Sequence, residues 1–351
     1  MPETCRFFGN GLPARGKLLR HSGIASERTQ GGSKEGLVLI FPATLSGDFA
    51  KVRGAMAVCI SFINFKGGVG KTASTVNIAA CLAAYEHKRV LVVDLDPQCN
   101  SSLWLMQPQA WREHVGKGRR SVYQLFRDHI NGTHVFDFDE AVVRGVPRRE
   151  FPLIASLDLL PASVELLKIE DQIYQNKYGQ FFSYLYKSLK PHLSEYDYVF
   201  FDCPPNLYAV TKNALFASEY CVVPYVPDFL SLSGFQVLAE QVDAFAKRIS
   251  GYVTGRKPVS IGALLVSHYR AVGNVFAQAI NEMEMQLNKF KAGELVAAEA
   301  EILQPYIRYC VAVAESTDEH LPVVLHKVNS IGAQDYFQLA KAFDKHFQSL
   351  T

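Results

Sequence analysis

The stretch Lys66-Gly67-Gly68-Val69-Gly70-Lys71-Thr72 decides the fold expected for this chain. An apolar run over 57–63 precedes it, and a helix-forming run over 73–84 follows it. A strand, a glycine-rich loop and a helix in this order are the context of a phosphate-binding loop. The glycines let backbone N–H groups turn toward an anion, and the helix N-terminus adds a partial positive charge there. The alternative, an ordinary glycine-rich turn with a solvated lysine, does not explain the flanking elements.

The two lysines of this stretch have different expected roles. Lys71 would reach the outer phosphates of a nucleotide, and the hydroxyl of Thr72 would bind Mg²⁺. Lys66 cannot easily fold back onto the same phosphates as Lys71. We therefore expect it to reach a nucleotide on a partner subunit, as an arginine finger supplied in trans does.

Two further apolar strands end in acids. Residues 90–93 run into Asp94-Leu95-Asp96-Pro97-Gln98-Cys99-Asn100, and residues 198–201 run into Asp202-Cys203-Pro204-Pro205. Side chains at the C-terminal ends of parallel strands point into the ligand crevice. The pattern predicts that these carboxylates lie beside the phosphate loop, although acids in solvated turns after strands are also common.

Taken together, K-G-G-V-G-K-T, D-L-D-P-Q-C-N and D-C-P-P resemble the deviant Walker-A ATPases of the ParA/MinD type, and most closely the ParA-type partition ATPases. The resemblance implies an α/β fold: a doubly wound, mostly parallel sheet flanked by helices. It implies a single P-loop ATPase domain over 56–351. The implied cofactors are ATP and Mg²⁺, with slow, switch-type hydrolysis of ATP to ADP and phosphate. Strands that alternate with helices from residue 57 onward agree with this fold.

The resemblance also assigns roles to single residues. Lys66 and Lys71 act on the phosphates, and Asp96 orients the attacking water. Thr72 binds Mg²⁺ directly, whereas Asp94 and Asp202 bind it through water. The nucleotide-binding residues are those of the loop and the first helical turn: Lys66, Gly67, Gly68, Val69, Gly70, Lys71, Thr72 and Ala73.

Two positions depart from the family pattern. Cys99 stands where glycine is usual. Ala73 stands where a hydroxyl residue usually reaches the α-phosphate, and Ser74 is one place further on. The second departure predicts a modest loss of nucleotide affinity.

Composition limits the classes of partner. The 351 residues are 48% hydrophobic and carry a formal net charge of +2, so any contact with DNA must be a local patch. The seven cysteines form no C-x-x-C pair, so they give no zinc-site pattern. Their odd number and apolar neighbours indicate reduced, mostly buried thiols in a cytoplasmic protein. No apolar run approaches the roughly 18 residues of a membrane-spanning helix.

Residues 1–55 differ from the rest of the chain. They hold eight Lys/Arg and four Asp/Glu, and they show no sustained periodicity. We expect a disordered basic extension. It could contact nucleic acid, act as an organellar transit peptide, or be a segment that is not native, with the protein starting at Met56. We favour the last of these.

The remaining pattern predicts a long helix over 164–189, a strand over 302–307 and a closing helix after Gly332. The closing helix carries an apolar stripe and a polar face with little excess positive charge. We therefore expect it to pack on the sheet rather than bind an anionic membrane as in MinD-like relatives. The stripe is Tyr336, Leu339, Ala340, Phe343 and Phe347, and the polar face is Asp335, Lys341, Asp344 and Lys345.

Three functions fit this resemblance. The leading one is a DNA-segregation ATPase, cytoplasmic and nucleoid-associated, that binds nonspecific DNA as an ATP-bound homodimer. A ParB-like partner protein would stimulate its ATP hydrolysis. A ParA-like ATPase that positions a protein cargo and a MinD-like membrane-surface ATPase are the alternatives. Each candidate DNA contact is more often a solvated surface charge, and Ala312 stands where the family often has an arginine. The candidates are Lys247, Arg248, Arg270, Lys289, Lys291, Arg308 and Lys327.

Overall fold

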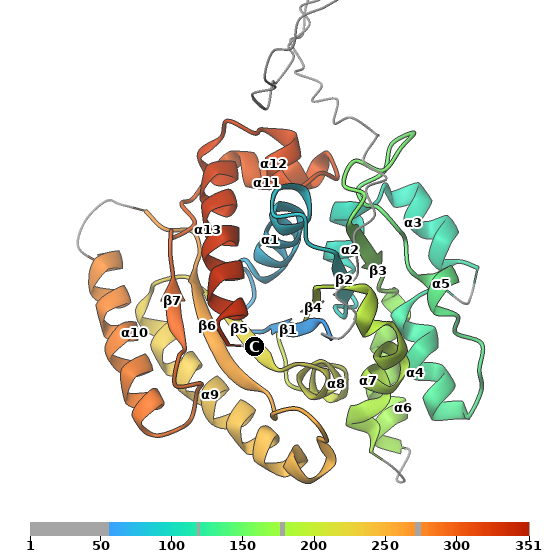
Figure 1. The fold of residues 1–351 in the computed structure, drawn as a ribbon, viewed down its shortest axis with the longest axis horizontal. Coiled ribbons are helices and arrows are strands. Elements are labelled where there is room, and N and C mark those ends of the chain that lie inside the picture. Colours follow the sequence, from blue (N-terminus) through green and yellow to red (C-terminus); the bar gives the residue numbers. More distant parts are fainter. Residues whose placement is uncertain (1–55, 118–119, 176–179, 271–274, 351) are drawn as a thin grey trace, which may run out of the picture. The chain divides into compact units, whose positions relative to one another are not determined.

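A computed structural model describes residues 56–117, 120–175, 180–270 and 275–350 (Figure 1). Its strands form one seven-stranded sheet in the order β3-β2-β4-β1-β5-β6-β7, and neighbouring strands run parallel throughout. The strands are β1 (Val58–Phe62), β2 (Val90–Asp94), β3 (Leu157–Leu160), β4 (Tyr198–Asp202), β5 (Tyr220–Tyr225), β6 (Ser260–Val266) and β7 (Glu301–Leu303).

The order of the strands places the ligand crevice. The chain starts near the middle of the sheet at β1, moves outward through β2 to β3, and returns to β4 beside β1. It then moves outward on the other side through β5, β6 and β7. In such sheets a ligand binds beyond the C-terminal ends of the strands, where the direction of winding reverses. The phosphate loop follows β1 at this place.

Helices cover both faces of the sheet, as the doubly wound prediction requires. α1, α12 and α13 pack on one face, and α4, α6, α7, α8, α9 and α10 pack on the other. The helices are α1 (Lys71–Tyr85), α2 (Asn100–Leu105), α3 (Pro108–Val115), α4 (Val122–Asn131), α5 (Phe138–Ala141), α6 (Leu167–Gln175), α7 (Tyr184–Leu189), α8 (Ala209–Ala217), α9 (Phe229–Ile249), α10 (Val275–Ala292), α11 (Val311–Asp318), α12 (Val323–His326) and α13 (Ile331–Gln348).

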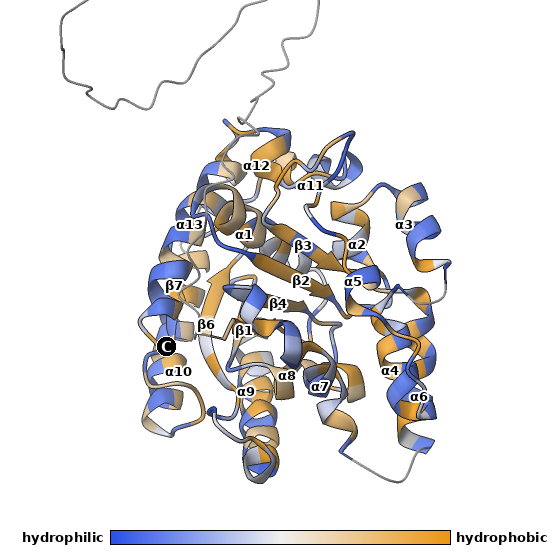
Figure 2. Cartoon of the chain, turned by 45° about the vertical axis from the view of Figure 1, so that its right-hand side comes forward, coloured by the Kyte–Doolittle hydropathy of each residue, from blue (hydrophilic) through white to orange (hydrophobic). Residues whose placement is uncertain are grey.

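The strands are apolar on both faces because both are covered. Ile60 and Phe62 of β1 join the core under α1 and α13, whereas Cys59 joins the core on the other face. Figure 2 shows the central strands in the hydrophobic colour and many helices with hydrophilic outer surfaces.

The closing helix α13 packs on the sheet, as expected. All five residues of its apolar stripe are buried, and the Phe343 ring lies 5.5 Å from that of Phe200 on β4. One expectation about its polar face is wrong. Asp335 is only 4% exposed, because it accepts hydrogen bonds from Arg308.

Two other expectations need correction. The long helix over 164–189 is divided into a 3₁₀ turn at Val164–Leu166, then α6, a second 3₁₀ turn at Phe181–Ser183, and α7. Residues 176–179, which lie between α6 and the second 3₁₀ turn in the sequence, are outside the described residues. The last strand ends at Leu303 rather than at residue 307 because Pro305 has no N–H for the ladder.

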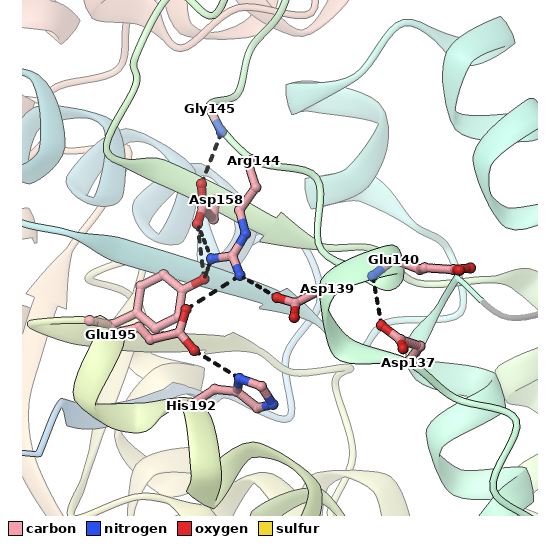
Figure 3. Close-up of polar contacts among 9 residues, drawn as sticks. Asp137, Asp139, Glu140, Arg144, Gly145, Asp158, His192 and Glu195 are labelled. Carbon is pink, nitrogen blue, oxygen red and sulfur yellow. Dashed lines mark hydrogen bonds and ion pairs between the residues drawn. The ribbon is translucent and has the colours of Figure 1, made fainter.

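An arginine-centred network fastens the segment before β3 to the edge of the sheet (Figure 3). The Arg144 guanidinium donates to Asp158 of β3 at 2.9 Å, to Asp139 of α5 at 3.0 Å and to Tyr196. Asp158 also accepts from the Gly145 N–H at 2.9 Å. This network gives order to a region whose sequence shows no clear periodicity, and it lies apart from the phosphate loop in the chain and in the sheet.

No helix of the described residues is long and apolar enough to cross a membrane. The expected basic extension over 1–55 lies outside the described residues. The division of the chain at residue 56 therefore stays a prediction.

We predict that residues 1–55 are dispensable for the ATPase. A protein that starts at Met56 should match the full chain in ATP hydrolysis rate and melt within about 2 °C of it. Calorimetry and a phosphate-release assay on both proteins test this. A much lower melting temperature of the shortened protein would show that the extension stabilises the domain.

Candidate functional site

The phosphate loop takes the backbone form that its glycines permit. Gly68 and Gly70 have φ of 73° and 78°, in the left-handed region that other residues rarely adopt. A Cβ on Gly70 would also lie 3.2 Å from the Cβ of Ser267, the residue after β6. The loop then enters α1 at Lys71, so the free N–H groups of the helix face the same space.

Lys71 and Thr72 are the first two residues of α1, directly after the phosphate loop. The Lys71 side chain crosses the loop, and its Nζ donates to the Lys66 carbonyl oxygen at 3.2 Å. Burial lowers the pKa of Lys71, and the nearby carboxylates of Asp202 and Asp96 oppose that shift. The Thr72 hydroxyl faces the Asp202 carboxylate. The ammonium group and the hydroxyl are therefore held within one polar pocket.

The two strand-end acids lie side by side because Asp94 of β2 and Asp202 of β4 are register partners in the sheet. Burial raises the pKa of both carboxyls, and the proximity of Asp202 raises that of Asp94 further. Ser101 donates to Asp202 Oδ2 at 2.7 Å, whereas Asp202 Oδ1 is buried and makes no hydrogen bond in the protein. A buried carboxylate oxygen of this kind suits a water of a hydrated cation.

Both carboxylate oxygens of Asp94 already accept hydrogen bonds from within the chain. Its Oδ2 accepts from the backbone N–H and the hydroxyl of Ser102, at 2.8 and 2.6 Å, and its Oδ1 accepts from the Asp96 N–H. In this conformation Asp202 is better placed for Mg²⁺ than Asp94, whose role as a metal ligand through water stays a prediction. The sequence analysis missed Ser101 and Ser102, although they directly follow the acid motif.

Asp96 lies at the edge of the cavity and is 7% exposed. Its Oδ1 accepts from the Gln98 N–H at 2.9 Å, and the carbonyl of Asp96 accepts from the Cys99 N–H. Cys99 has a φ of 58°, which explains why glycine is usual at this position. The turn directs the Asp96 carboxylate toward the phosphate loop.

The loop and Asp96 border a cavity of about 370 Å³, and neither Asp94 nor Asp202 is among its lining residues. Residues from the C-terminal part of the chain also line it, and the sequence analysis did not identify them as nucleotide-site residues. Those residues are Ser267, His268, Ile307, Arg308, Tyr309, Cys310, Val313, Ala314, Thr317 and Tyr336.

Lys66 does not point into its own loop. Its Nζ forms an ion pair with Asp228, just before α9, at 2.6 Å, and its backbone N–H donates to Asn64. Both side chains of the pair are about 40% exposed, at 40% and 41%. The Lys66 side chain is therefore held at the surface beside Asp228, where a second molecule can reach it.

Several candidate DNA contacts are paired within the chain. Lys247 pairs with Asp243, Lys327 with Glu315, and Arg308 with Asp335 through two N–H donors. An Arg308→Glu change would place a carboxylate against buried Asp335, so it cannot isolate a DNA contact. Arg270 has no ion pair among the described residues, and it stacks on the Tyr309 ring at 4.7 Å.

Comparison with known proteins identifies the family. A family model described as an AAA domain matches residues 57–254, which include all three motifs. The chain belongs to the ParA/MinD family of P-loop ATPases. This family member is similar to the sporulation initiation inhibitor protein Soj of Bacillus subtilis, with 29% identity over 286 residues, 82% of this chain and 98% of Soj. It is also similar to the chromosome partitioning protein ParA of Myxococcus xanthus, with 26% identity over 291 residues, 82% of this chain and 87% of that protein.

A solved structure shows the same fold with its ligands. Cobyrinic acid a,c-diamide synthase of Mycobacterium smegmatis, with a bound ATP analog and magnesium, has a TM-score of 0.59 and 22% identity, covering 84% of this chain and 97% of that one. The site of our ParA/MinD-family chain fits the same cofactors, ATP and Mg²⁺. Lys71 and the loop amides suit the phosphates, and Thr72 with the unpartnered Asp202 Oδ1 suits the hydrated cation.

Proposed function

We propose that the protein is a DNA-segregation ATPase whose ATP-bound homodimer binds DNA without regard to sequence and whose hydrolysis is stimulated by a ParB-like partner. Hydrolysis would open the dimer and release the DNA. Such a switch works in the cytoplasm, on the nucleoid. The similarity to Soj and ParA over most of the chain supports this proposal.

The position of Lys66 carries the dimer part of the proposal. A lysine that acted on its own nucleotide would turn into the loop, whereas the Lys66 ammonium lies beside Asp228 at the surface. In a face-to-face dimer it would exchange this partner for the phosphates of the other subunit. Phosphoryl transfer depends on such positioned cations, because charge develops on the phosphate oxygens.

Within each subunit, the chain's own residues hold the reactants. Lys71 and the loop amides bind the phosphates, and Asp96 accepts a hydrogen bond from the attacking water and aims it. Thr72 and Asp202 would hold Mg²⁺, which would neutralise phosphate charge when bound. ATP hydrolysis would be slow because the attacking water is fully positioned only after the dimer forms.

The two alternatives differ in what the dimer binds. A ParA-like ATPase that positions a protein cargo would share this site, and only the partner separates the two functions. A membrane-surface ATPase of the MinD type is less supported, because α13 buries its apolar stripe in the core.

We predict duplex binding that requires ATP and weakens steeply with salt, by about 0.9 in the log–log slope per phosphate contact. Arg270→Glu should lower the affinity for all sequences alike and reduce the slope by about 1. Lys168→Glu on α6 is the matched control, since Lys168 is exposed and lies outside the candidate group. Fluorescence anisotropy with two unrelated duplexes measures both quantities.

One result would directly contradict the proposal that the dimer binds DNA. If the ATP-bound dimer has no affinity for duplex DNA at low salt, DNA segregation fails as the function. A protein platform would then replace DNA as the surface on which the dimer acts.

A further inference from the structure

Position 73, in the first turn of α1, offers no hydroxyl to the cavity. Ala73 lines the cavity beside Thr72 and offers no hydrogen-bond donor there. Ser74, the next residue, is 0% exposed, and its hydroxyl lies beside Tyr336 of α13. A phosphate oxygen seated beside Ala73 would need a hydroxyl from another element in place of the one that Ala73 lacks.

The Ser74 hydroxyl is itself unsatisfied. It makes no hydrogen bond of acceptable geometry in the protein, and its burial removes it from water. A buried hydroxyl without a partner carries a free-energy cost, and its occurrence beside a ligand site points to an absent group.

Tyr336 of α13 supplies the missing donor. Its hydroxyl lies next to the Ser74 hydroxyl, its side chain is 1% exposed, and it lines the same cavity as Ala73 and Thr72. Burial raises the pKa of the Tyr336 phenol, so it keeps its proton at neutral pH and can donate. A phenol can at the same time accept one hydrogen bond and donate another.

The start of α13 is fixed firmly enough to aim this phenol. Ser330 caps the helix by accepting from the Ala333 N–H. Next to Tyr336, buried Asp335 accepts from the Arg308 backbone N–H and from two N–H groups of its guanidinium, at 3.0, 2.9 and 2.6 Å. The Tyr336 ring is therefore positioned before a ligand arrives, which limits the entropy lost on binding.

We propose that the Tyr336 hydroxyl binds a nucleotide phosphate at the N-terminus of α1, with the Ser74 hydroxyl donating to Tyr336, in place of the side-chain hydroxyl that Ala73 lacks. The closing helix thereby becomes part of the nucleotide site. In this relay the phenol oxygen accepts from Ser74, and the phenol proton is donated to a phosphate oxygen. This proposal concerns nucleotide binding and does not depend on dimerisation or on DNA.

Tyr336→Phe tests the proposal, with Mg²⁺–ADP affinity measured by calorimetry on the full chain. The phenol donates to a charged group, so its loss should weaken ADP binding about 10-fold. Tyr198→Phe is the matched control, since Tyr198 is another buried tyrosine whose hydroxyl donates to Asp344, outside the cavity. It should bind ADP as the unchanged protein does.

A hydroxyl introduced at position 73 shows whether Tyr336→Phe loses ADP affinity through a lost phosphate contact or through altered packing. Ala73→Thr should recover most of the lost affinity in the Tyr336→Phe background and add little in the unchanged protein. Ser74→Ala, which keeps the phenol, should weaken ADP binding by a smaller factor and serves if Tyr336→Phe folds poorly. Unchanged ADP affinity in Tyr336→Phe, or a loss that Ala73→Thr does not reduce, overturns the proposal.

Discussion

Asp96→Ala is expected to bind ATP and dimerise as the unchanged protein does, but to hydrolyse ATP about 100-fold more slowly. Asp96 lines the cavity with the phosphate loop, and in the proposed function it positions the attacking water rather than holding the nucleotide. Positioned acids and bases contribute roughly two to four orders of magnitude to such steps. Nucleotide affinity by calorimetry and single-turnover hydrolysis separate the two effects.

Asp202→Ala is the contrasting variant. Asp202 lies deeper than Asp96, faces Thr72 and carries the unpartnered oxygen. Its removal should weaken the Mg²⁺-dependent part of ATP affinity about 10-fold, as loss of an outer-sphere metal partner does. Equal hydrolysis by Asp96→Ala and the unchanged protein would remove Asp96 from the mechanism.

Lys66→Ala is expected to bind ATP as a monomer and to fail to form the ATP-dependent dimer. The change removes only an exposed side chain whose partner in the chain is Asp228, so the fold and the nucleotide pocket should remain intact. Cations supplied in trans contribute about three to five orders of magnitude to phosphoryl transfer, so hydrolysis should fall by about 10³-fold or more.

Light scattering with a non-hydrolysable ATP analogue measures the dimer. Lys168→Glu provides the control for a changed surface charge, since Lys168 is exposed on α6 and only loosely paired with Glu165 at 3.7 Å. A Lys66→Ala protein that dimerises normally with the analogue would show that Lys66 is not the dimer contact.

The sequence predicted the parts of the site that are contiguous in the chain. Local patterns predicted the phosphate loop, the acids at the ends of β2 and β4, and the parallel sheet. The spacing of glycines and the apolar runs are visible in the sequence itself. Cys99 was recognised as a departure, and its left-handed φ shows why glycine is usual there.

What the sequence could not predict depends on contacts between distant segments. The pairing of Lys66 with Asp228 joins residues 162 positions apart, and neither residue type signals the other. Tyr336 was assigned to the apolar stripe because its spacing matches the core, yet its ring also lines the cavity. Arg308 was a candidate DNA contact because its charge is visible, whereas its anchoring to Asp335 is not.

The central claim is that Lys66 of one subunit acts on the nucleotide of the other. Mixing Lys66→Ala with Asp96→Ala tests it most directly, because each variant alone hydrolyses ATP very slowly. In a mixed dimer, the Lys66→Ala subunit keeps its own Asp96 and receives Lys66 from its partner. We predict that Asp96→Ala, which keeps Lys66, captures Lys66→Ala in a mixed dimer and that the mixture recovers hydrolysis well above the sum of the two variants. If a tag on one variant captures the other in the presence of ATP but hydrolysis stays at that sum, Lys66 acts within its own subunit.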